Sequence, residues 1–396
     1  MSAAATLPAF DARDPLALDT QLDDEERLIR DTVRQYVREK FLPHVAEYWG
    51  AGSLPDSTGP ELGQLGLLGM HLSGYGCAGA SATAYGLTCL ELEAGDSGLR
   101  SFCSVQGSLA MFAIWRWGSE EQKQRWLPGM AEGTTIGCFG LTEPDAGSNP
   151  AGMRTRARRK NGDTWVLNGS KMWITNGSVA DVAVVWARTE DGKINGFLVE
   201  KGMEGFSAPV MHGKLSLRAS VTSELVLDGV EVPEANRLPE ASSLRAPLSC
   251  LNEARYGIVW GAAGAARACY EAALDYAKTR VQFEQPIAAY QLTQAKLVDM
   301  AVKVAQSTML AMQLGRLKDA GNLRPEQVSF GKYHNVSAAL EVARSARTVL
   351  GANGVTLEYP VLRHANNLES VLTYEGTHEM HTLILGQAIT GIAAFK

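Results

Sequence analysis

Apolar residues recur at three- and four-residue steps over the first third of the chain, which is the spacing of an amphipathic helix. One such stretch carries Leu28, Val33 and Val37 and follows acidic residues that can cap a helix start. Glycine-rich breaks, the first near residues 50–60, separate further helices. Residues 1–135 are therefore predicted to form an α-helical domain.

The pattern changes near residue 136. Short runs rich in β-branched and aromatic residues appear, such as VAVVWA at 182–187 and ELVLDGVEVP at 224–233. Glycine, asparagine and proline separate these runs, as is typical of a small antiparallel sheet. We expect this β-domain to span residues 136–240.

Helical spacing returns near residue 241 in long stretches that lack proline. One stretch runs over roughly 247–281, and Pro286 and Pro325 lie near the starts of the next two, where a helix tolerates proline. Four antiparallel helices of this length would make a bundle, so residues 241–396 are predicted to form a C-terminal four-helix bundle domain. The order α, β, α predicts an α+β fold class that is mostly α.

Composition narrows the class of protein. At 396 residues the chain exceeds what one hydrophobic core usually serves, and 45% hydrophobic with 20% charged residues is typical of a soluble globular protein. A net charge of −6 argues against bulk binding to nucleic acid, and no apolar run is long enough for membrane insertion. Six cysteines without CxxC spacing favour buried thiols in a reducing compartment. Because the first twenty residues lack the pattern of a secretory signal, we predict a cytoplasmic protein.

Two short patterns have a functional interpretation that their context does not favour. GYGCAG at 74–79 matches the dinucleotide pattern GxGxxG, but it lies between predicted helices rather than after a strand, which favours a loop. His378 and His381 have a spacing that could hold a metal. No third ligand or HExxH pattern accompanies them, which favours a structural role and no metal site.

Three other stretches combine polar groups with turn residues. FGLTEPDAGSNP at 139–150 could cradle a phosphate or bond a ring edge through free backbone N–H groups, or it could be a plain interdomain turn. KMWITNG at 171–177 puts an aromatic side chain beside small polar residues, which suits a flat conjugated cofactor. TYEGTHE at 373–379 places Glu375 within apolar helical spacing, where a carboxylate is either a costly accident or a working base.

These stretches occur in order with several longer ones: ELEAGDSGLRSFCSVQ, GCFGLTEPDAGS, ADVAVVWAR, CLNEARYGIVWG and NLESVLTYEGTHEMHTLILGQAITGIAAF. With them the chain resembles the acyl-CoA dehydrogenase family from about residue 20 to Phe395, and within that family the glutaryl-CoA dehydrogenases. The resemblance implies the family fold, with an N-terminal helical domain, a middle β-domain and a C-terminal four-helix bundle. It also implies a homo-oligomer, a tetramer built as a dimer of dimers.

The resemblance implies that FAD is the cofactor and lies between the β-domain and the bundle, with its adenosine half reaching a neighbouring subunit. By position, the flavin contacts on one subunit would be Phe139, Leu141, Thr142, Gly147, Ser148, Trp173, Ile174 and Thr175. The site would be completed, in part from the partner chain, by Arg280, Phe283, Gln291, Gly351 and Thr377, with Glu379 facing the adenosine side.

Glu375 matches the family's catalytic base, which would remove the α-proton of a CoA thioester while hydride leaves the β-carbon for the flavin. The Glu375 N–H and a flavin hydroxyl would bind the thioester carbonyl, and burial would raise the pKa of Glu375 toward neutrality. Tyr374 would border the substrate, and Gly376 would let the thioester approach. The electrons would pass to an electron-transfer flavoprotein.

By itself, Arg100 would be interpreted as one half of a surface ion pair. The resemblance instead implies that Arg100 and nearby Ser104 hold a distal carboxylate of the substrate, which arginine can grip through two parallel hydrogen bonds. Glu93 and Tyr374 fall where decarboxylating members carry the same residues, which favours conversion of glutaryl-CoA to crotonyl-CoA and CO₂. The remaining substrate contacts implied by position are Ser101, Ser148, Asn252 and Arg255, the last two for the CoA moiety.

Three positions depart from the family pattern. Glu284 replaces the glycine of Arg-x-x-Phe-Gly, Ala352 stands where a second glycine is common, and Leu99 stands where a tyrosine often precedes the arginine. Two further functions are therefore kept as alternatives. One is a dehydrogenase for another short-chain or dicarboxylyl-CoA that stops at the enoyl product, and the other is a flavin-binding family member without catalysis.

Overall fold

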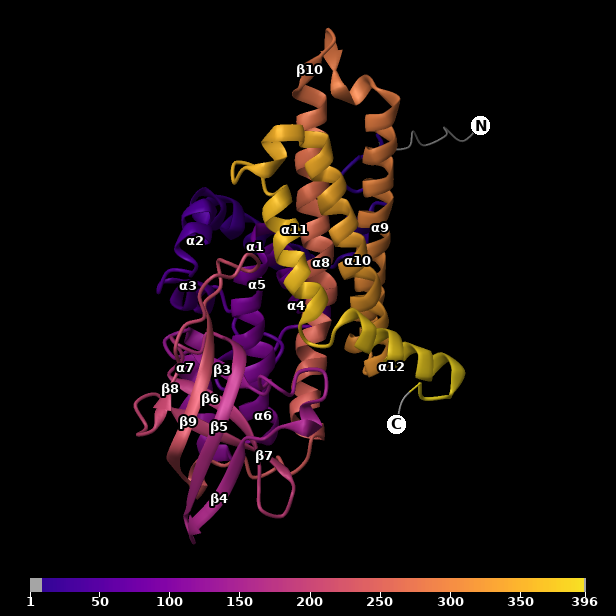
Figure 1. Ribbon diagram of the computed structural model, residues 1–396. Helices are drawn as coiled ribbons and strands as arrows, with labels where there is room; N and C mark the ends of the chain where they lie inside the picture. The colour runs from indigo at the N-terminus through magenta and orange to yellow at the C-terminus, as the bar shows by residue number, and fades with distance from the viewer. Residues whose placement is uncertain (1–8, 395–396) are drawn as a thin grey trace.

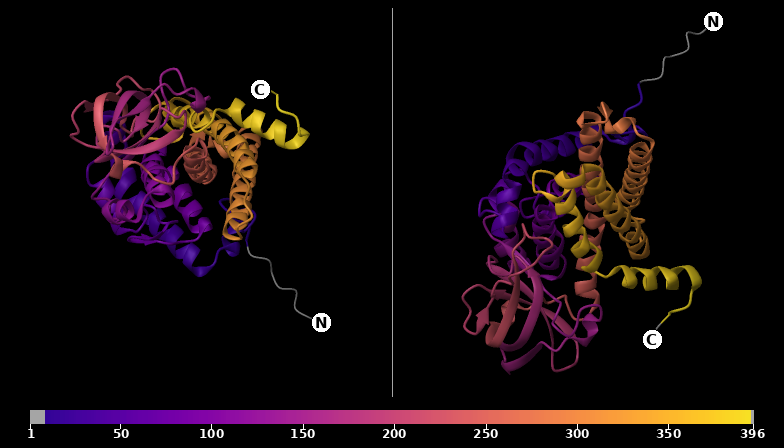
Figure 2. Two further views of the ribbon diagram at one scale, coloured as in Figure 1. Left: turned by 90° about the horizontal axis from the view of Figure 1, so that it is seen from below. Right: turned by 45° about the horizontal axis from the view of Figure 1, so that its top comes forward.

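The computed structural model describes residues 9–394, and it contains two helical regions with a β-sheet between them in the chain (Figure 1). The sheet lies at one end of the molecule beside the N-terminal helices, and the long C-terminal helices run away from it (Figure 2). The last helix points away from the rest of the molecule in these views. The first eight residues, part of the segment for which no secretory signal is predicted, lie outside the described residues.

The first region is built around α4 (Ala82–Gly95), which is buried on almost every side. Two other helices, α1 (Asp24–Tyr36) and α8 (Arg245–Thr279), pack against α4, and each supplies an ion-pair partner for Glu91 of α4. A capping box of Asp23 and Glu26 begins α1. The other elements of the region are α2 (Val45–Ala51), α3 (Thr58–Gln64), β1 (Ser73–Gly74), β2 (Cys77–Ala78), α5 (Ser97–Ser104), α6 (Phe112–Trp117), α7 (Glu120–Glu132) and π-helical turns at Val37–Phe41 and Val105–Met111.

The middle region is a seven-stranded sheet of β3 (Gly137–Gly140), β4 (Arg156–Asn161), β5 (Thr164–Thr175), β6 (Val182–Arg188), β7 (Ile194–Glu200), β8 (Phe206–Ser207) and β9 (Thr222–Pro233). The strand order is β3-β6-β4-β5-β9-β8, with β7 paired to β6. Side chains that alternate along β5 and β9, such as Leu167 and Val230, form the core of the sheet. The longest pairs are antiparallel, but β3 runs parallel to β6, with Phe139 opposite Val184.

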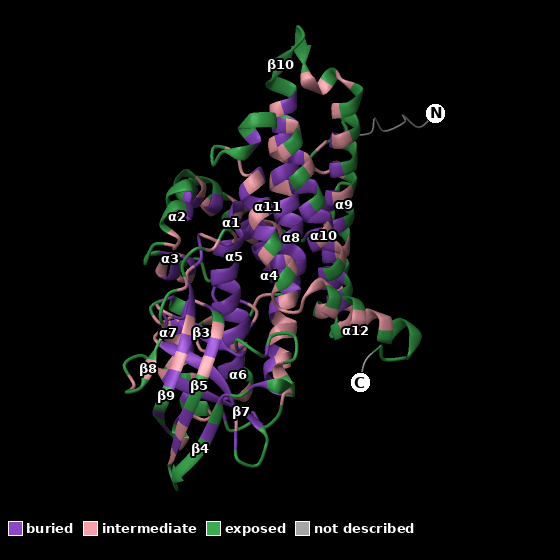
Figure 3. Cartoon of the chain, in the orientation of Figure 1, coloured by how far each residue is buried: buried purple, intermediate pink, exposed green. Residues whose placement is uncertain are grey.

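The last region is a bundle of α8, α9 (Gln291–Asp319), α10 (Pro325–Leu350) and α11 (Val361–Thr373), followed by α12 (His378–Thr390). A hairpin of β10 (Val281–Gln282) and β11 (Gln285–Pro286) joins α8 to α9. Helices α8 and α4 touch at glycine: a Cβ on Gly264 would stand 1.9 Å from the Leu90 carbonyl oxygen. Figure 3 shows α4 and α5 as mostly buried, whereas the β10 hairpin and the end of α12 are exposed.

The order of helices, sheet and helices confirms the predicted fold class. The long helix predicted at roughly 247–281 is α8, and Pro325 is the first residue of α10. The parallel pairing of β3 with β6 was not predicted. All six cysteines are free, and all but Cys77 are buried. Among residues 9–394, no helix is both long and apolar enough to cross a membrane.

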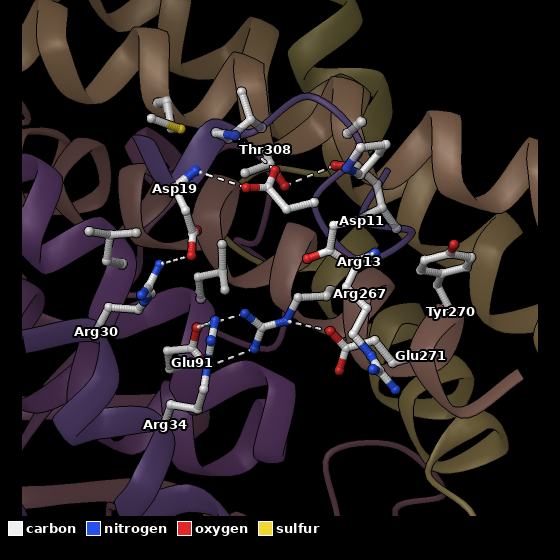
Figure 4. Close-up of a pocket in the computed structure, with 18 of the residues that line it drawn as sticks. Asp11, Arg13, Asp19, Arg30, Arg34, Glu91, Arg267, Tyr270, Glu271 and Thr308 are labelled. Atoms are coloured by element: carbon white, nitrogen blue, oxygen red, sulfur yellow. Dashed lines mark hydrogen bonds and ion pairs between the residues drawn. The ribbon is translucent and has the colours of Figure 1, made fainter. Parts of the chain in front are cut away.

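A crevice between α1, α4 and α8 holds an ion-pair cluster that joins the first region to the bundle (Figure 4). Glu91 of α4 is buried, and Arg34 of α1 and Arg267 of α8 approach it from two sides. Arg34 donates from Nη2 at 2.9 Å, and Arg267 donates from both Nη groups at 2.6 Å. Burial alone would raise the pKa of Glu91, but Arg267 and Arg34 outweigh it and lower the pKa to about 2. The cluster therefore holds a permanent carboxylate that ties three helices together.

Candidate active site

A tight turn joins α11 to α12 and carries Glu375. Tyr374 ends α11 in an extended conformation, and Thr377 begins α12 by accepting a hydrogen bond from the Met380 N–H. Glu375 and Gly376 both have positive φ angles, 53° and 93°. A left-handed backbone costs a residue other than glycine about 1 kcal/mol or more, so surrounding groups must hold Glu375 in place.

Two cations, buried Lys332 and half-buried Arg255, hold this turn through its carbonyl oxygens. Lys332 of α10 donates from Nζ to the Tyr374 oxygen at 2.5 Å and to the Gly376 oxygen at 2.6 Å. Arg255 of α8 donates from Nε to the Glu375 oxygen at 2.7 Å. Three consecutive carbonyls are thus bonded to side-chain cations, which maintains the strained backbone. The Glu375 N–H, by contrast, donates to no acceptor among residues 9–394.

The Glu375 carboxylate is surrounded by other groups, but one of its oxygen atoms accepts no hydrogen bond from them. Its Oε2 atom is buried and has no hydrogen-bond partner among the described residues. Burial raises the pKa of Glu375 above its usual range, against the opposing charges of Arg100, Lys332 and Arg255. Burial also lowers the pKa of Lys332 to about 7. A carboxylate with a raised pKa and a free oxygen is suited to take a proton from a bound molecule.

Arg100 of α5 lies next to the same turn. It is 1% exposed, donates from Nε to Glu93 Oε2 at 2.5 Å, and donates from Nη2 to the Tyr374 hydroxyl. The N-cap of α5 is Asp96, whose side chain also accepts a hydrogen bond from Arg363 of α11. The helix of Arg100 and the helix that precedes Glu375 are therefore tied together. Arg100 is a buried cation, not the surface ion pair that its sequence context suggests.

Several buried polar atoms around Arg100 have no hydrogen-bond partner. Some belong to residues close to Arg100 in the sequence, and one belongs to its ion-pair partner. Within residues 9–394, the hydroxyls of Ser101 and Ser104 and the Oε1 atom of Glu93 have no hydrogen-bond partner. A buried polar group left unpaired costs roughly 1–3 kcal/mol, so these atoms are available to bond to a polar group that enters beside Arg100. Gly261 of α8 leaves room for the ion pair, because a Cβ there would stand 2.1 Å from Glu93 Oε2.

The loop after β3, one of the predicted flavin contacts, is braced against β5. The Met172 N–H donates to the Thr142 oxygen at 2.9 Å, which joins the two predicted flavin stretches. Buried Lys171 and Glu143 form an ion pair at 2.8 Å beneath the loop, and Lys171 also donates to the Leu141 oxygen at 3.1 Å. The structure therefore brings residues 139–148 and 173–175 together.

The same edge of the sheet offers an open aromatic surface. Trp173 is 58% exposed and has a φ of 66°, a strained backbone that turns this residue out of the regular strand. An exposed indole beside a polar loop fits a flat conjugated cofactor. Among the other predicted contacts, the exposed or half-buried ones are Thr142, Gly147, Ser148 and Thr175, and the buried ones are Phe139, Leu141 and Ile174.

The second group of predicted flavin contacts lies elsewhere. Phe283 is 90% exposed in the β10 hairpin, at the end of the bundle that lies away from the sheet (Figures 1 and 2). Arg280, Gln291 and Gly351 adjoin this hairpin or cap the neighbouring helices, whereas Thr377 and Glu379 stand at the start of α12. Within one chain the structure does not bring Phe283 to the sheet edge.

The histidine pair and GYGCAG lie outside this chemistry. His378 stacks on Tyr333, with ring centroids 4.1 Å apart. His381 is buried against Gly376, where a Cβ would come within 3.0 Å of His381 Nε2. No group of three His, Cys, Asp or Glu side chains that could hold a metal is found in the described part of the chain. GYGCAG contributes to the short β1–β2 hairpin between helices.

Lys332 is the residue of the site that the sequence interpretation missed. It shares the buried side of α10 with Val328, Asn335 and Ala339, and a lysine at helical spacing among such residues was the available signal. Arg255 was predicted to contact CoA together with Asn252. Its guanidinium lies against the Glu375 carbonyl and donates to Asn252 Oδ1 at 3.2 Å, and the CoA contact stays a prediction.

Comparisons with known proteins give a consistent result. Three family models match in order: acyl-CoA dehydrogenase N-terminal domain at residues 23–134, middle domain at 138–230 and C-terminal domain at 244–390. A crystal structure of glutaryl-CoA dehydrogenase from Mycobacterium smegmatis is 65% identical with a TM-score of 0.96, covering 98% of this chain and 100% of that one. A second structure from that organism, a glutaryl-CoA dehydrogenase in complex with FADH2, is 60% identical with the same TM-score and coverage. An acyl-CoA dehydrogenase of Bacillus subtilis is 36% identical over 373 residues, which is 93% of this chain and 98% of the relative.

Proposed function

The chain belongs to the acyl-CoA dehydrogenase family and is an FAD-dependent enzyme that acts on CH–CH bonds, and we propose that it oxidises and decarboxylates glutaryl-CoA. The products are crotonyl-CoA and CO₂. The observation that carries the proposal is buried Arg100, which donates a hydrogen bond to the hydroxyl of the residue preceding Glu375. The glutaryl-CoA dehydrogenase structures at 60–65% identity support the same substrate.

The cofactor would be held at the open sheet edge by Trp173, Thr142 and Ser148, where exposed aromatic and polar groups fit it. When bound, FAD supplies a hydride acceptor for the β-carbon of the substrate. Phe283 and Arg280 lie away from this edge in one chain, so their predicted flavin contacts require a second copy of the chain. This supports a homo-oligomer, for which we propose a tetramer. An electron-transfer flavoprotein is the proposed electron acceptor.

Glu375 takes the α-proton. Burial raises its pKa, and its unpartnered Oε2 is free to face the α-carbon. As the proton leaves, negative charge grows on the thioester oxygen. The Glu375 N–H has no acceptor among residues 9–394, so it is available to donate to that oxygen and lower the barrier.

Arg100 selects the distal carboxylate of glutaryl-CoA. Its Nε remains on Glu93, while Nη1 donates to no acceptor among the described residues and Nη2 can exchange the Tyr374 hydroxyl for the substrate. Two parallel N–H groups match the two oxygens of a carboxylate. The hydroxyls of Ser101 and Ser104 can satisfy the remaining lone pairs.

Decarboxylation follows from the oxidised intermediate. The bond between the γ-carbon and the distal carboxylate breaks, CO₂ leaves, and the electron pair is delocalised through the new double bond into the thioester. Protonated Glu375 returns its proton to the γ-carbon, which gives crotonyl-CoA and restores the carboxylate. Arg100 Nη2 can donate to the Tyr374 hydroxyl again once CO₂ has left.

The proposal is tested by adding glutaryl-CoA and an artificial electron acceptor to the purified protein and identifying the product by mass spectrometry. Crotonyl-CoA is the expected product. Glutaconyl-CoA would instead support a dehydrogenase that does not decarboxylate, and the absence of any product, together with a flavin band that no acyl-CoA bleaches, would support a non-catalytic flavin protein.

An Arg100→Gln variant tests the substrate assignment. Turnover of glutaryl-CoA should fall about a hundredfold more than turnover of butyryl-CoA, because a hydrogen bond to a charged group contributes roughly 2–3 kcal/mol. Arg34→Gln, which changes another arginine paired with a buried glutamate, is the control and should leave the ratio of the two activities unchanged. Equal losses with both substrates in Arg100→Gln would contradict the assignment.

A further inference from the structure

Lys332 and the Glu375 N–H meet at one peptide unit. The carbonyl of Tyr374 and the N–H of Glu375 belong to the same planar amide, whose atoms share electrons by resonance. Lys332 Nζ donates to that carbonyl at 2.5 Å. The N–H at the other end of the amide is the group that lacks an acceptor among residues 9–394. The ammonium group and the free donor therefore lie at opposite ends of one polarisable unit.

Burying the side chain of Lys332 costs free energy, because no carboxylate forms an ion pair with it among the described residues. The side chain is 2% exposed on α10. Removing an ammonium from water costs several kcal/mol. Lys332 instead donates hydrogen bonds to two neutral carbonyls of the turn that carries Glu375. A neutral donor could also satisfy these carbonyls, and burial lowers the pKa of Lys332 to about 7, so the charge that Lys332 carries near and below pH 7 requires its own explanation.

We propose that Lys332 is a positioning residue that strengthens the Glu375 N–H as a hydrogen-bond donor to the substrate's thioester carbonyl, by holding its ammonium group on the carbonyl of the same peptide unit. A cation on the oxygen draws electrons from the nitrogen and makes the N–H more positive, and linked hydrogen bonds reinforce one another in this way. The inference rests on the proposed function of Glu375 as the base.

Arg255 makes a useful contrast. It bonds to the carbonyl of Glu375, which belongs to the next peptide unit and shares its resonance with the N–H of Gly376. Arg255 therefore supports the shape of the turn without acting on the proposed donor. Among the cations that hold the turn, Lys332 is placed at the amide that faces the thioester in the proposed mechanism.

The experiment separates proton removal from oxidation. The probe is 3-thiaglutaryl-CoA, in which sulfur replaces the β-methylene, so no hydride can leave and only the α-proton can exchange. Exchange in D₂O is followed by mass spectrometry. The ¹³C chemical shift of the bound thioester carbonyl, labelled in the probe, reports directly how strongly its oxygen is hydrogen-bonded.

Two variants remove the charge in different ways. Lys332→Met removes the charge and both hydrogen bonds, whereas Lys332→Gln keeps an N–H₂ group that can still bond to the carbonyls. In both, α-proton exchange should slow about tenfold or more, because a hydrogen bond with an ionised partner is roughly twice as strong as a neutral one. The carbonyl shift should move toward that of the free probe, while flavin content and melting temperature are recorded for each variant.

Lys214→Met is the matched control. Lys214 also donates from Nζ to two backbone carbonyls, those of Leu217 and Ser220, but in a loop of the middle region. It should change neither the exchange rate nor the carbonyl shift. Exchange and shift in Lys332→Gln equal to those of the wild type would overturn the proposal, and so would equal losses in Lys214→Met and Lys332→Met. If Lys332→Met does not fold, Lys332→Gln decides.

The proposed function fails in a different way. If the wild-type protein exchanges no α-proton of the probe and turns over no acyl-CoA, then Glu375 is not the base, whatever the variants do. If the wild type exchanges the proton and both Lys332 variants match it, the function stands and only the role of Lys332 is wrong.

Discussion

Glu91 on α4, which is buried, and Glu375 after α11, whose Oε2 atom is buried, each lie beside arginine or lysine side chains. The carboxylate of Glu91 accepts hydrogen bonds from Arg34 and Arg267, and its pKa falls to about 2. The carboxylate of Glu375 lies near Arg100, Lys332 and Arg255, and its pKa rises. The number of nearby cations therefore does not decide what a buried carboxylate does.

The difference lies in where the cations point their N–H groups. At Glu91 the guanidinium groups donate to the carboxylate itself, which stabilises the charged form and leaves it no capacity as a base. At Glu375 Lys332 and Arg255 donate to backbone carbonyls, so the carboxylate feels their charge but keeps Oε2 unpartnered in the described structure. One arrangement ties helices together, and the other leaves a carboxylate oxygen free for the proton transfer that we propose.

Replacing Glu375, the proposed base, should have the largest effect. Glu375→Gln removes the proton acceptor while keeping the shape of the side chain, so turnover of acyl-CoA should fall by about 10³–10⁴-fold. Glu369→Gln, an exposed change on α11, is the control and should keep full turnover. The measurement is the steady-state rate with an artificial acceptor. Retention of more than a tenth of the activity in Glu375→Gln would remove Glu375 from the mechanism.

Glu91→Gln should affect stability rather than turnover. It leaves Arg34 and Arg267 without their partner, and because both arginines can still reach water the free energy of unfolding should fall by about 2–3 kcal/mol. The rate per folded, flavin-loaded molecule should stay within twofold of the wild type. Urea unfolding and steady-state kinetics on the same preparation measure the two effects. A large loss of turnover with unchanged stability would erase the distinction between the two glutamates.

The two glutamates should also respond to pH with opposite signs. Glu91 has a folded-state pKa of about 2, below the ordinary 4.5, so its stabilising contribution is present above 4.5 and is lost as the pH falls toward 2. Glu375 has a folded-state pKa raised above 4.5, so its contribution is fully present below 4.5 and is lost as the pH rises through the raised folded-state pKa. From pH 4 upward, the melting temperature of Glu375→Gln should therefore rise relative to that of the wild type as the pH increases. The deficit of Glu91→Gln should shrink as the pH falls below about 5. Parallel pH curves for both variants would contradict the contrast.

Periodicity and proline position were enough to predict α8 and the start of α10, because these long helices repeat their apolar spacing over many turns. The pairing of β3 with β6 was not predictable, since a four-residue strand carries no signal for its partner. Glu375 was identified as a charged residue in apolar spacing. Its raised pKa depends on which groups donate to which oxygens, and the cation that holds its turn, Lys332, comes from a different helix. Such contacts arise only when the chain folds.

Glu284 allows the effect of backbone strain to be measured apart from the effect of burial. Of the predicted changes, the one at Glu284 should be the smallest. Glu284 has a φ of 68°, close to that of Glu375, but it lies exposed in the turn between β10 and β11, where both central residues have positive φ. Glu284→Gly should relieve the strain and raise the free energy of unfolding by about 1 kcal/mol or less, since glycine is also more flexible in the unfolded chain. Glu284→Ala is the matched control, because it removes the carboxylate but keeps Cβ, and it should give no gain. Thermal unfolding between pH 5 and pH 8 is the measurement, and the gain should not vary over this range. An equal gain in both variants would mean that charge rather than strain is relieved, and the comparison of Glu284 with Glu375 would then lose its basis.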